Sequence, residues 1–497
     1  MNRIVRTKDL IYSMKHDLYY GGAWHRAGSG SEVDVKNPSN GETLARVAWA
    51  DAADADKAVK AAYEGFLKWK RVKPLDRAII LRRAAAIIRE HAEELGFIDA
   101  ADTGGPFKRM IRDGEGGALA FDFFAGLVTE IKGDTIPVSE DNLNYTLREP
   151  LGVVVRINAY NHPFLFAASH AAAPLAAGNA VIIKPPEQAP LSTLRFAELV
   201  GSLFPPGVVS VLPGGRACGE ALVTHDLVAK VGLIGSIPTG KAILRGAAGT
   251  LKKVSLELGG KNALIAYPDA DPAKVAAGMV QGMNFVWCGQ SCGSTSRAFL
   301  HDSIHDAVLE KVKASVDALR FGDPTDPETE MGCLVSQDQL DKVAMYVEAG
   351  RKEGARVVTG GRRATDPNLA RGFYFEPTIF ADVTPQMRIA REEIFGPVLS
   401  VIRWRDEDDM FKAVNELDYG LTASIWTRDL STAHRAAARV EAGYVWVNGA
   451  STHYFGVPFG GYKQSGLGRE ESIEELLANT QIKNVNVTLD GVLSASV

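Results

Sequence analysis

Short runs of apolar, mostly β-branched residues recur in the middle of the chain and alternate with helical patterns. The runs cover residues 152–157, 180–183, 208–212, 231–234 and 254–258. Apolar residues at helical spacing fill the gaps, at 164–177, 191–204 and 239–248. Strands that are apolar throughout are typical of a parallel sheet covered by helices on both faces. The pattern therefore predicts a Rossmann-like nucleotide-binding arrangement.

A second alternation of the same kind follows residue 260. It predicts strands at 262–266, 398–404, 423–426 and 444–448, and helices at 272–283 and 305–318. A sheet and helices of this order form a domain of their own. The chain is therefore expected to be an α/β protein with two domains.

The remaining segments carry weaker signals. Residues 59–69 present one apolar helical face and residues 80–95 another, so the first part of the chain is expected to be helical. Residues 132–150 look loop-rich. The tail at 482–489 alternates apolar and polar residues, which predicts a terminal strand that pairs with another strand, of this subunit or of a second one.

The composition is that of an ordinary globular protein and argues against several functions. The 497 residues are 46% hydrophobic and 23% charged, with a formal net charge of −5. The chain has no excess of basic residues that would indicate binding to nucleic acid. It also has no polybasic tract that would indicate binding to a membrane surface. The N-terminus lacks the apolar core of a signal peptide, and the longest apolar stretch, at 164–177, is too short and interrupted to span a bilayer. We expect a cytoplasmic protein without nucleic-acid or membrane partners.

Two segments carry candidate chemistry. Cys292 lies in Gly289-Gln290-Ser291-Cys292-Gly293, where glycines permit a tight, exposed turn, and Glu257 ends an apolar strand in Leu256-Glu257-Leu258-Gly259-Gly260. A thiolate can act as a nucleophile, and a carboxylate held in a cleft can activate water. A lone cysteine more often packs than reacts. The four cysteines of the chain are too few and too scattered for a disulfide framework or a zinc site, so no metal is expected.

These two segments belong to a longer series of motifs. In chain order the motifs are Asn161-His162-Pro163, Lys184-Pro185-Pro186-Glu187, Gly235-Ser236, Glu257-Leu258-Gly259-Gly260-Lys261, Gly289-Gln290-Ser291-Cys292, Glu393-Ile394-Phe395-Gly396-Pro397 and Pro458-Phe459-Gly460-Gly461-Tyr462-Lys463-Gln464-Ser465-Gly466. The succession resembles the aldehyde dehydrogenase superfamily, of the NAD(P)-dependent, hydrolytic type. The resemblance runs from about Leu18 to the C-terminus.

The resemblance implies a role for each catalytic candidate. Cys292 adds to the aldehyde, and the oxyanion is held by the amide of Asn161 and the backbone N–H of Cys292. After hydride transfer leaves a thioester, Glu257 activates the water that hydrolyses it. Asn158 lacks the Asn-x-Pro context, so a structural role is expected for it. Cys288 is interpreted as a packing residue, with a reversible disulfide as the alternative.

The resemblance also implies a cofactor site for NAD. Lys184 and Glu187 match contacts to the adenosine ribose, and the carboxylate favours NAD over NADP, with NADP use left open. Gly235 and Ser236 match the pyrophosphate contact at a helix N-terminus. Glu393 matches the ligand of the nicotinamide ribose, and Phe395 packs near that ring.

The substrate tunnel departs from relatives that oxidise quaternary-ammonium aldehydes, because it lacks their aromatic cage for a cation. Aligned with the family, the tunnel is lined by His162, Phe166, Ser169, Trp287, Ser291, His453, Tyr454 and Phe455. Aromatic rings and histidines suit an aromatic or similarly bulky aldehyde better than betaine aldehyde. The competing interpretation is that these side chains only pack the tunnel wall.

The resemblance implies three parts of the chain. Residues 1–130 and 151–259 are expected to form the NAD-binding domain and 260–465 the catalytic domain. Residues 131–150 and 480–497 are expected to form a small β arm for oligomerisation, in a homodimer or homotetramer. Two other functions stay open: a relative that passes the thioester to coenzyme A, and a catalytically silent member that acts as a binding protein. The presence of Glu257 argues against the first, and the complete set of catalytic residues argues against the second.

Overall fold

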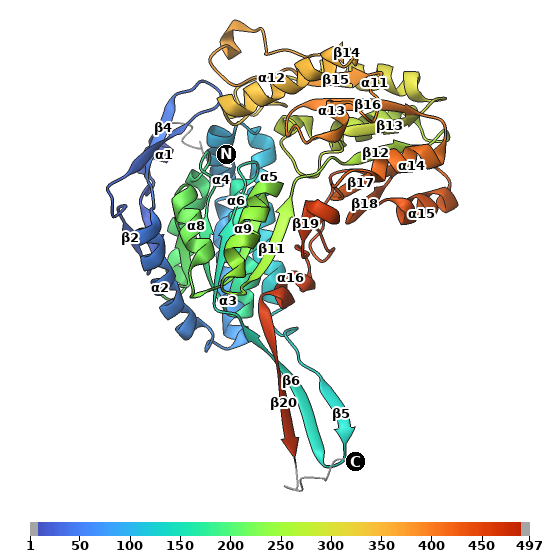
Figure 1. Ribbon diagram of the computed structural model, residues 1–497. Coiled ribbons are helices and arrows are strands. Elements are labelled where there is room, and N and C mark those ends of the chain that lie inside the picture. The colour runs from blue at the N-terminus through green and yellow to red at the C-terminus, as the bar shows by residue number, and fades with distance from the viewer. Residues whose placement is uncertain (1–7, 489–497) are drawn as a thin grey trace.

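The computed structural model describes residues 8–488. Two lobes, each built on its own sheet, lie side by side, and a thin β arm projects from the first lobe (Figure 1). The predicted α/β class is confirmed. None of the helices in the described range combines the length and the apolar character that crossing a membrane requires.

The first lobe is built on an eight-stranded sheet in the order β19-β11-β10-β7-β8-β9-β1-β2. Its five central strands are parallel, as the apolar runs predict. They are β7 (Val153–Ile157), β8 (Ala180–Lys184), β9 (Val209–Val211), β10 (Val228–Gly235) and β11 (Lys253–Leu258). The edge strands are β1 (Leu18–Tyr20), β2 (Ala23–His25) and β19 (Gly466–Leu467), and β3 (Glu32–Lys36) and β4 (Thr43–Ala48) form a separate hairpin.

Helices cover both faces of this sheet, because its strands are apolar on both sides. One face packs against α2 (Ala52–Trp69), α8 (Arg216–Thr224) and α9 (Ile237–Ala248). The other face packs against α3 (Pro74–Glu90), α5 (Phe107–Gly126), α6 (Pro163–Ala177) and α7 (Leu191–Val200), with α4 (Ala92–Thr103) beside α5. Short helices α1 (Lys8–Ser13), η1 (Gly201–Leu203) and α16 (Ile473–Ala478) complete the lobe.

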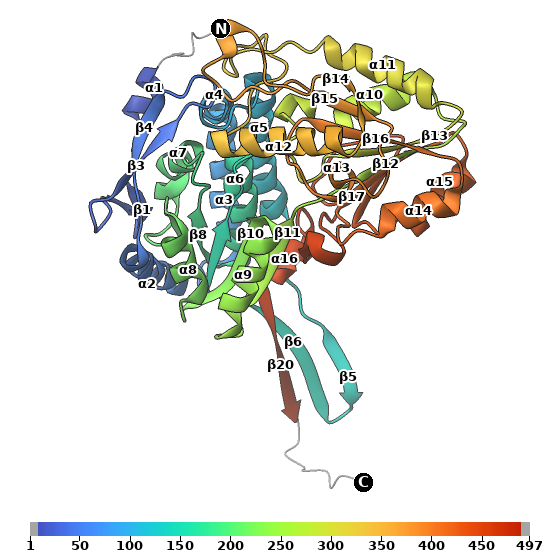
Figure 2. The same ribbon diagram turned by 45° about the horizontal axis from the view of Figure 1, so that its top comes forward.

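The second lobe contains a seven-stranded sheet in the order β14-β15-β16-β13-β12-β17-β18 (Figure 2). The strands are β12 (Ala263–Ala266), β13 (Arg297–His301), β14 (Arg356–Thr359), β15 (Thr378–Ala381), β16 (Val398–Trp404), β17 (Thr422–Trp426) and β18 (Tyr444–Val447). The helices are α10 (Pro272–Gly282), α11 (His305–Asp317), α12 (Gln337–Lys352), α13 (Arg388–Arg391), α14 (Glu407–Asn415) and α15 (Leu430–Arg439), with short turns η2 (Phe285–Trp287), η3 (Pro367–Leu369) and η4 (Lys463–Ser465). Six strands are parallel, and only β14 runs against its neighbour.

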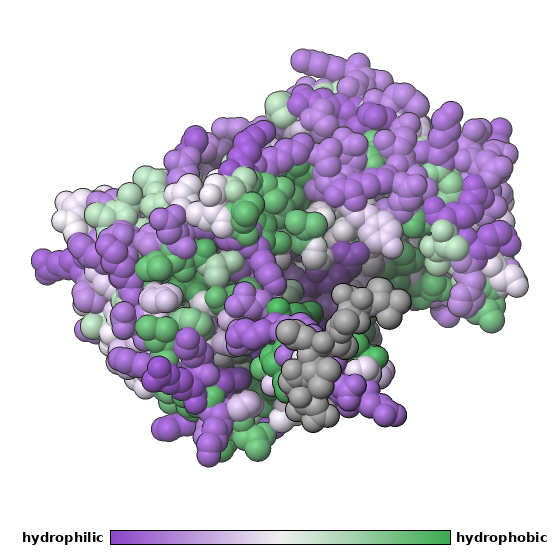
Figure 3. All heavy atoms as spheres, turned by 60° about the horizontal axis from the view of Figure 1, so that its bottom comes forward, coloured by the Kyte–Doolittle hydropathy of each residue, from purple (hydrophilic) through white to green (hydrophobic). Residues whose placement is uncertain are grey.

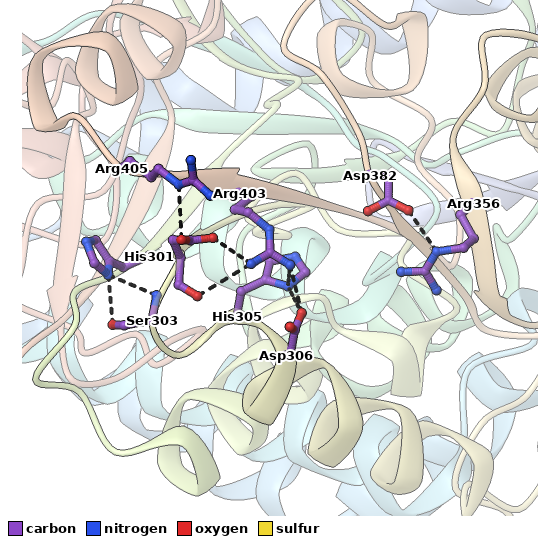
Figure 4. Close-up of polar contacts among 9 residues, drawn as sticks. His301, Ser303, His305, Asp306, Arg356, Asp382, Arg403 and Arg405 are labelled. Atoms are coloured by element: carbon purple, nitrogen blue, oxygen red, sulfur yellow. Dashed lines mark hydrogen bonds and ion pairs between the residues drawn. The ribbon is translucent and has the colours of Figure 1, made fainter.

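Ion pairs join the ends of neighbouring strands on the surface of the second lobe (Figure 4). Arg403 of β16 contacts Asp302, which follows β13, at 2.6 Å and Asp306 of α11 at 2.7 Å. Arg405 contacts Asp302 at 3.0 Å. Exposed pairs of this kind contribute about 0–1 kcal/mol each, so they align the strand ends without deciding the fold.

The arm corrects one expectation. Residues 132–150 are not loop-rich: β5 (Thr135–Ser139) and β6 (Asn142–Pro150) form an antiparallel hairpin. The predicted tail strand is β20 (Thr480–Thr488), and it pairs with β6 of the same chain from Thr480 opposite Pro150 to Thr488 opposite Asn142. Residues 142–148 do alternate, with Leu143, Tyr145 and Leu147 on one face, but Pro137 and the polar turn after Ser139 gave the segment the composition of a loop. Residues 489–497 of the predicted arm lie outside the described range.

Candidate active site

A cavity of about 1300 Å³ lies where the two lobes meet. Its wall includes Asn161, Glu257 and Cys292. Asn161 follows β7, Glu257 lies on β11, and Cys292 lies in the loop between η2 and β13. The fold thus brings together three side chains that are far apart in the sequence.

The loop that carries Cys292 has an unusual backbone. Asn284 and Cys288 adopt left-handed conformations with φ of 56° and 54°, and Gly289 follows with φ of 65°. A Cβ on Gly289 would lie 2.2 Å from the carbonyl oxygen of Gly396. Left-handed non-glycine residues are costly and gather at functional sites. The glycine permits the close approach of this loop to the segment that contains Glu393.

Asn262, which the sequence analysis did not single out, holds this loop in place. Its Nδ2 donates to the carbonyl oxygens of Cys292, at 2.7 Å, and Ser294, at 3.0 Å. Its Oδ1 accepts the backbone N–H of Thr422 at 3.0 Å. Asn262 stands directly before β12, so it ties the nucleophile loop to the central strands of the second sheet. Its position two residues after the glycine pair is the only sequence signal that could have drawn attention to it.

Cys292 differs from the other three cysteines in its exposure. Cys218, Cys288 and Cys333 are buried, whereas Cys292 is partly open toward the cavity. All four are free thiols. Burial raises the pKa of the Cys288 thiol, which agrees with a packing role for that residue.

Burial raises the proton affinity of both the Glu257 carboxyl and the Cys292 thiol. Burial raises the pKa of Glu257 well above its ordinary value, and the charge of Glu470 adds to the shift. Burial also raises the pKa of Cys292, and the neighbouring Glu257 carboxylate raises it further. Oε1 of Glu257 has no hydrogen-bond partner among the described residues. The pair therefore rests as a neutral thiol and a neutral carboxylic acid. Each can give up its proton only when the site stabilises the negative charge that results.

A buried ionic cluster lies behind Glu257. Glu470 contacts Nη2 of Arg156 at 2.7 Å and Nε2 of His170 at 3.1 Å. Its carboxylate is buried, yet these two partners hold its pKa well below the ordinary value against the effect of burial. Sequence reasoning missed this cluster, because its members come from β7, α6 and the segment after β19.

The two asparagines of the same segment differ in their surroundings. Asn161 lines the cavity, and its side chain makes no hydrogen bond with the described residues. The backbone N–H of Cys292 is likewise without a partner in the described chain. Both N–H groups are therefore free to donate to a bound oxygen. Asn158 is buried and does not line the cavity.

The predicted adenosine and pyrophosphate contacts lie at the carboxyl ends of the parallel strands. Nζ of Lys184, at the end of β8, lies 4.0 Å from Oε1 of Glu187, whose side chain is half exposed. Gly235 ends β10, and Ser236 is the N-cap of α9, where its hydroxyl accepts the N–H of Thr239 at 3.4 Å. The first turn of α9 contains no acidic side chain. This helix N-terminus can therefore accept an anionic diphosphate.

Glu393 lies against the glycine pair that follows Glu257. Its Oε1 accepts the N–H of Gly260 at 3.0 Å, and a Cβ on Gly259 would lie 2.1 Å from Oε2. Phe395 has a left-handed φ of 55°, and its ring meets the ring of Tyr160 edge-on at 5.7 Å. The two predicted nicotinamide contacts thus belong to a tightly constrained segment.

All eight predicted tunnel residues line the cavity: His162, Phe166, Ser169, Trp287, Ser291, His453, Tyr454 and Phe455. The ring of His162 lies 5.1 Å from that of Trp287 and 5.6 Å from that of Phe166. His162 Nδ1 also contacts Asp113 of α5 at 2.8 Å. The structure places these residues together, while their contact with a substrate stays a prediction. No group of three or more His, Cys, Asp or Glu in residues 8–488 could hold a metal ion.

Comparisons with known proteins agree on one family. The model of the aldehyde dehydrogenase family matches residues 24–485. The chain is 53% identical over 485 residues to aldehyde dehydrogenase tropH of Talaromyces stipitatus, covering 96% of this chain and 94% of that protein. It is 42% identical over 466 residues to a betaine aldehyde dehydrogenase of Cereibacter sphaeroides, covering 93% and 95%. The structure of an NAD+ complex of aldehyde dehydrogenase from Bacillus cereus superposes with a TM-score of 0.94 at 38% identity, covering 97% of this chain and 98% of that one.

Proposed function

The chain belongs to the aldehyde dehydrogenase family, and on that premise we propose that it oxidises an aldehyde to the carboxylic acid with NAD, through a thioester on Cys292. The observation that carries the proposal is the convergence of a partly exposed thiol, a free amide and a carboxyl whose Oε1 has no partner among the described residues on one cavity. Water supplies the oxygen of the product, and the overall change is aldehyde, NAD and water to acid, NADH and a proton.

In the first half-reaction the sulfur of Cys292 adds to the carbonyl carbon. The thiol proton passes to water as the carbon–sulfur bond forms, because the buried Glu257 rests in its protonated form and cannot accept it. The new oxyanion accepts hydrogen bonds from Nδ2 of Asn161 and the backbone N–H of Cys292. Removal of one such donor typically costs about 3 kcal/mol of transition-state stabilisation.

The cofactor site fits NAD. The N-terminus of α9 with Ser236 suits the diphosphate, Lys184 and Glu187 suit the adenosine ribose, and Glu393 suits the nicotinamide ribose. When bound, NAD supplies the acceptor for the hydride of the hemithioacetal. The carboxylate of Glu187 disfavours a 2′-phosphate, so NAD is preferred to NADP. We assign the cofactor to residues 1–130 and 151–259 and the nucleophile to residues 260–465.

In the second half-reaction Glu257 removes a proton from water that attacks the thioester. The neighbouring charge of Glu470 keeps Glu257 strongly basic, and the buried pair of Glu470 with Arg156 keeps that charge in place. Activity should therefore rise with pH above the range in which an ordinary carboxyl ionises, because the base acts only when deprotonated.

The arm supports assembly with further copies of the chain. Figure 3 looks toward the face that carries the arm, and hydrophobic residues interrupt the polar surface there. Large apolar side chains of the arm and of the region around α9 are exposed: Ile136, Val138, Leu143, Leu147, Ile482, Leu244 and Leu251. A thin three-stranded sheet that exposes apolar side chains gains stability when a second subunit covers them. We propose a homodimer or homotetramer.

The substrate we propose is an aromatic or similarly bulky aldehyde. On the cavity wall the rings of Trp287 and Phe166 meet the ring of His162 edge-on, at 5.1 and 5.6 Å between ring centres. Such rings bury a flat substrate and position it by edge and face contacts. A panel of benzaldehydes and short aliphatic aldehydes tests this: a much higher kcat/KM for the aliphatic compounds would refute it.

Glu257→Gln tests the mechanism. The variant should still release a burst of NADH, about one per active site, while its steady-state rate falls by about 10²–10⁴-fold, because only deacylation requires the base throughout. Full steady-state turnover of the variant would contradict the assignment. Wild-type turnover that depends on coenzyme A would identify an acyl transferase, and no burst with any aldehyde would identify a silent family member.

A further inference from the structure

Two arginines of α5 line the cavity, and no carboxylate of residues 8–488 forms an ion pair with either of them. Arg109 is half-buried and Arg112 is exposed, and both belong to the cavity wall. Neither guanidinium forms a hydrogen bond or an ion pair within residues 8–488. Elsewhere on the surface, arginines such as Arg403 and Arg405 are held by aspartates (Figure 4).

The position of these arginines is unfavourable for the helix. They lie in the first two turns of α5, where the positive end of the helix dipole disfavours cations, and the first turn contains no acidic residue. The nearby carboxylates have other partners: Glu328 contacts Lys108 at 3.3 Å, and Glu330 contacts Arg320 at 3.4 Å. Burial lowers the pKa of Arg109, the charge of Arg112 lowers it further, and the charge of Glu330 offsets this only in part. A structural role does not account for two cations at this place.

The acidic residues of the same cavity wall contact other side chains than these two arginines. Asp113 contacts His162 at 2.8 Å, Asp122 contacts Arg89 at 2.6 Å and Glu471 contacts His453 at 3.4 Å. Glu470 is paired with Arg156 and His170. Glu257 has a raised pKa, which favours its neutral form. A histidine compensates Asp113 only when it is protonated, but even with the charge of Asp113 counted in full, Arg109 and Arg112 leave the α5 end of the cavity positive.

We infer that the α5 end of the cavity binds a carboxylate at the far end of the substrate, so that the aldehyde is an aromatic or similarly flat molecule that carries a second, anionic group. The inference rests on the proposed function of the cavity. Asp113 contacts the tunnel residue His162. Along the axis of α5, Asp113 lies about 6 Å, one helical turn, from Arg109 and about 1.5 Å from its neighbour Arg112. A substrate that reaches past the His162 ring therefore meets the two guanidinium groups.

A carboxylate suits these residues better than a phosphate. A guanidinium binds a carboxylate through two parallel N–H···O bonds. Asp122 and Glu471 stand in the same wall, and a doubly charged phosphate would meet more repulsion from them than a singly charged carboxylate. The same positive end disfavours a quaternary-ammonium aldehyde.

The test compares two aldehydes of nearly equal shape, 4-carboxybenzaldehyde and methyl 4-formylbenzoate. The wild type should prefer the acid by about tenfold to hundredfold in kcat/KM, as loss of charged hydrogen bonds implies. The double variant Arg109→Gln/Arg112→Gln should bring this ratio close to one, mainly through KM for the acid. Because the ratio is taken within one enzyme, a general loss of activity cancels. The matched control is Arg83→Gln, an exposed arginine of α3 that does not line the cavity.

A binding measurement keeps the inference testable if no aldehyde turns over. Calorimetry should show tighter binding of terephthalate than of monomethyl terephthalate to the wild type, weakened by salt and by the double variant. Absence of turnover together with this binding would refute the proposed oxidation and leave the anion site standing. An acid-to-ester ratio near one in the wild type, a ratio unchanged in the double variant, or a preference for 4-formylphenyl phosphate would overturn the inference.

Discussion

Asn262→Ala should weaken both the stability of the second lobe and the chemistry at Cys292. The asparagine makes three hydrogen bonds, to the carbonyls of Cys292 and Ser294 and from the N–H of Thr422, at 2.7 to 3.0 Å. At about 1 kcal/mol each, their loss amounts to about 3 kcal/mol. For a domain of this size that corresponds to a fall of about 6–12 °C in the apparent melting temperature.

The effect on the reaction follows from the position of the lost bonds. Without the bond to its carbonyl, Cys292 can shift, and its backbone N–H then no longer points at the oxyanion. A misplaced donor typically costs about 10²–10³-fold in rate. The NADH burst measures this step, because the burst precedes deacylation, and we expect its rate constant to fall in that range.

Asn415→Ala is the matched control for this prediction. Asn415 also bonds two backbone groups, the carbonyl of Arg439 at 2.8 Å and the N–H of Glu441 at 3.1 Å, but it does not line the cavity. It should lower the melting temperature and leave the burst rate unchanged. If Asn262→Ala has the melting temperature and the burst rate of the wild type, the loop does not depend on this residue and the reasoning is wrong.

Two further predictions concern the glycine pair and a buried carboxyl. Gly259→Ala should raise the KM for NAD by about tenfold or more, because its Cβ would lie 2.1 Å from Oε2 of Glu393. The control Gly249→Ala, whose new Cβ meets open space, should leave the KM unchanged. Steady-state kinetics with varied NAD measure both values. Burial raises the pKa of Asp99 to about 8. A carboxyl whose pKa is raised by folding stabilises the protein at low pH and loses that contribution as pH rises from about 4 to 8. Asp99→Asn should therefore flatten the fall in melting temperature between about pH 4 and 8, and an unchanged pH dependence would contradict the assignment.

Much of the fold could be predicted from the sequence, because the buried strands of both lobes are continuously apolar. The runs at 152–157 and 180–183 became β7 and β8, and those at 398–404 and 423–426 became β16 and β17. The arm was predicted only in part. The tail strand was recognised by its alternation, while the strands in 132–150 were not, since Pro137 and the polar turn after Ser139 resemble a loop.

The candidate site was predictable where chemistry and motif coincide in one short segment. Cys292, Glu257 and Asn161 each stand in such a segment, and the structure places all three on one cavity. Asn262 and Glu470 were missed. Each acts through partners from distant elements. No local sequence pattern predicts the hydrogen bond from Asn262 to a loop thirty residues away.

By itself the sequence determined the alternation of strands and helices, the α/β class and the short segments able to carry a nucleophile, a base and an oxyanion donor, because these depend on local periodicity and residue type. Only the tertiary structure decided which charges remain uncompensated. Arg109 and Arg112 look in the sequence like any solvated arginines of a helix. Their proposed role depends on the cavity that α5 borders and on the partners that the surrounding carboxylates contact. Both are set by the packing of distant elements.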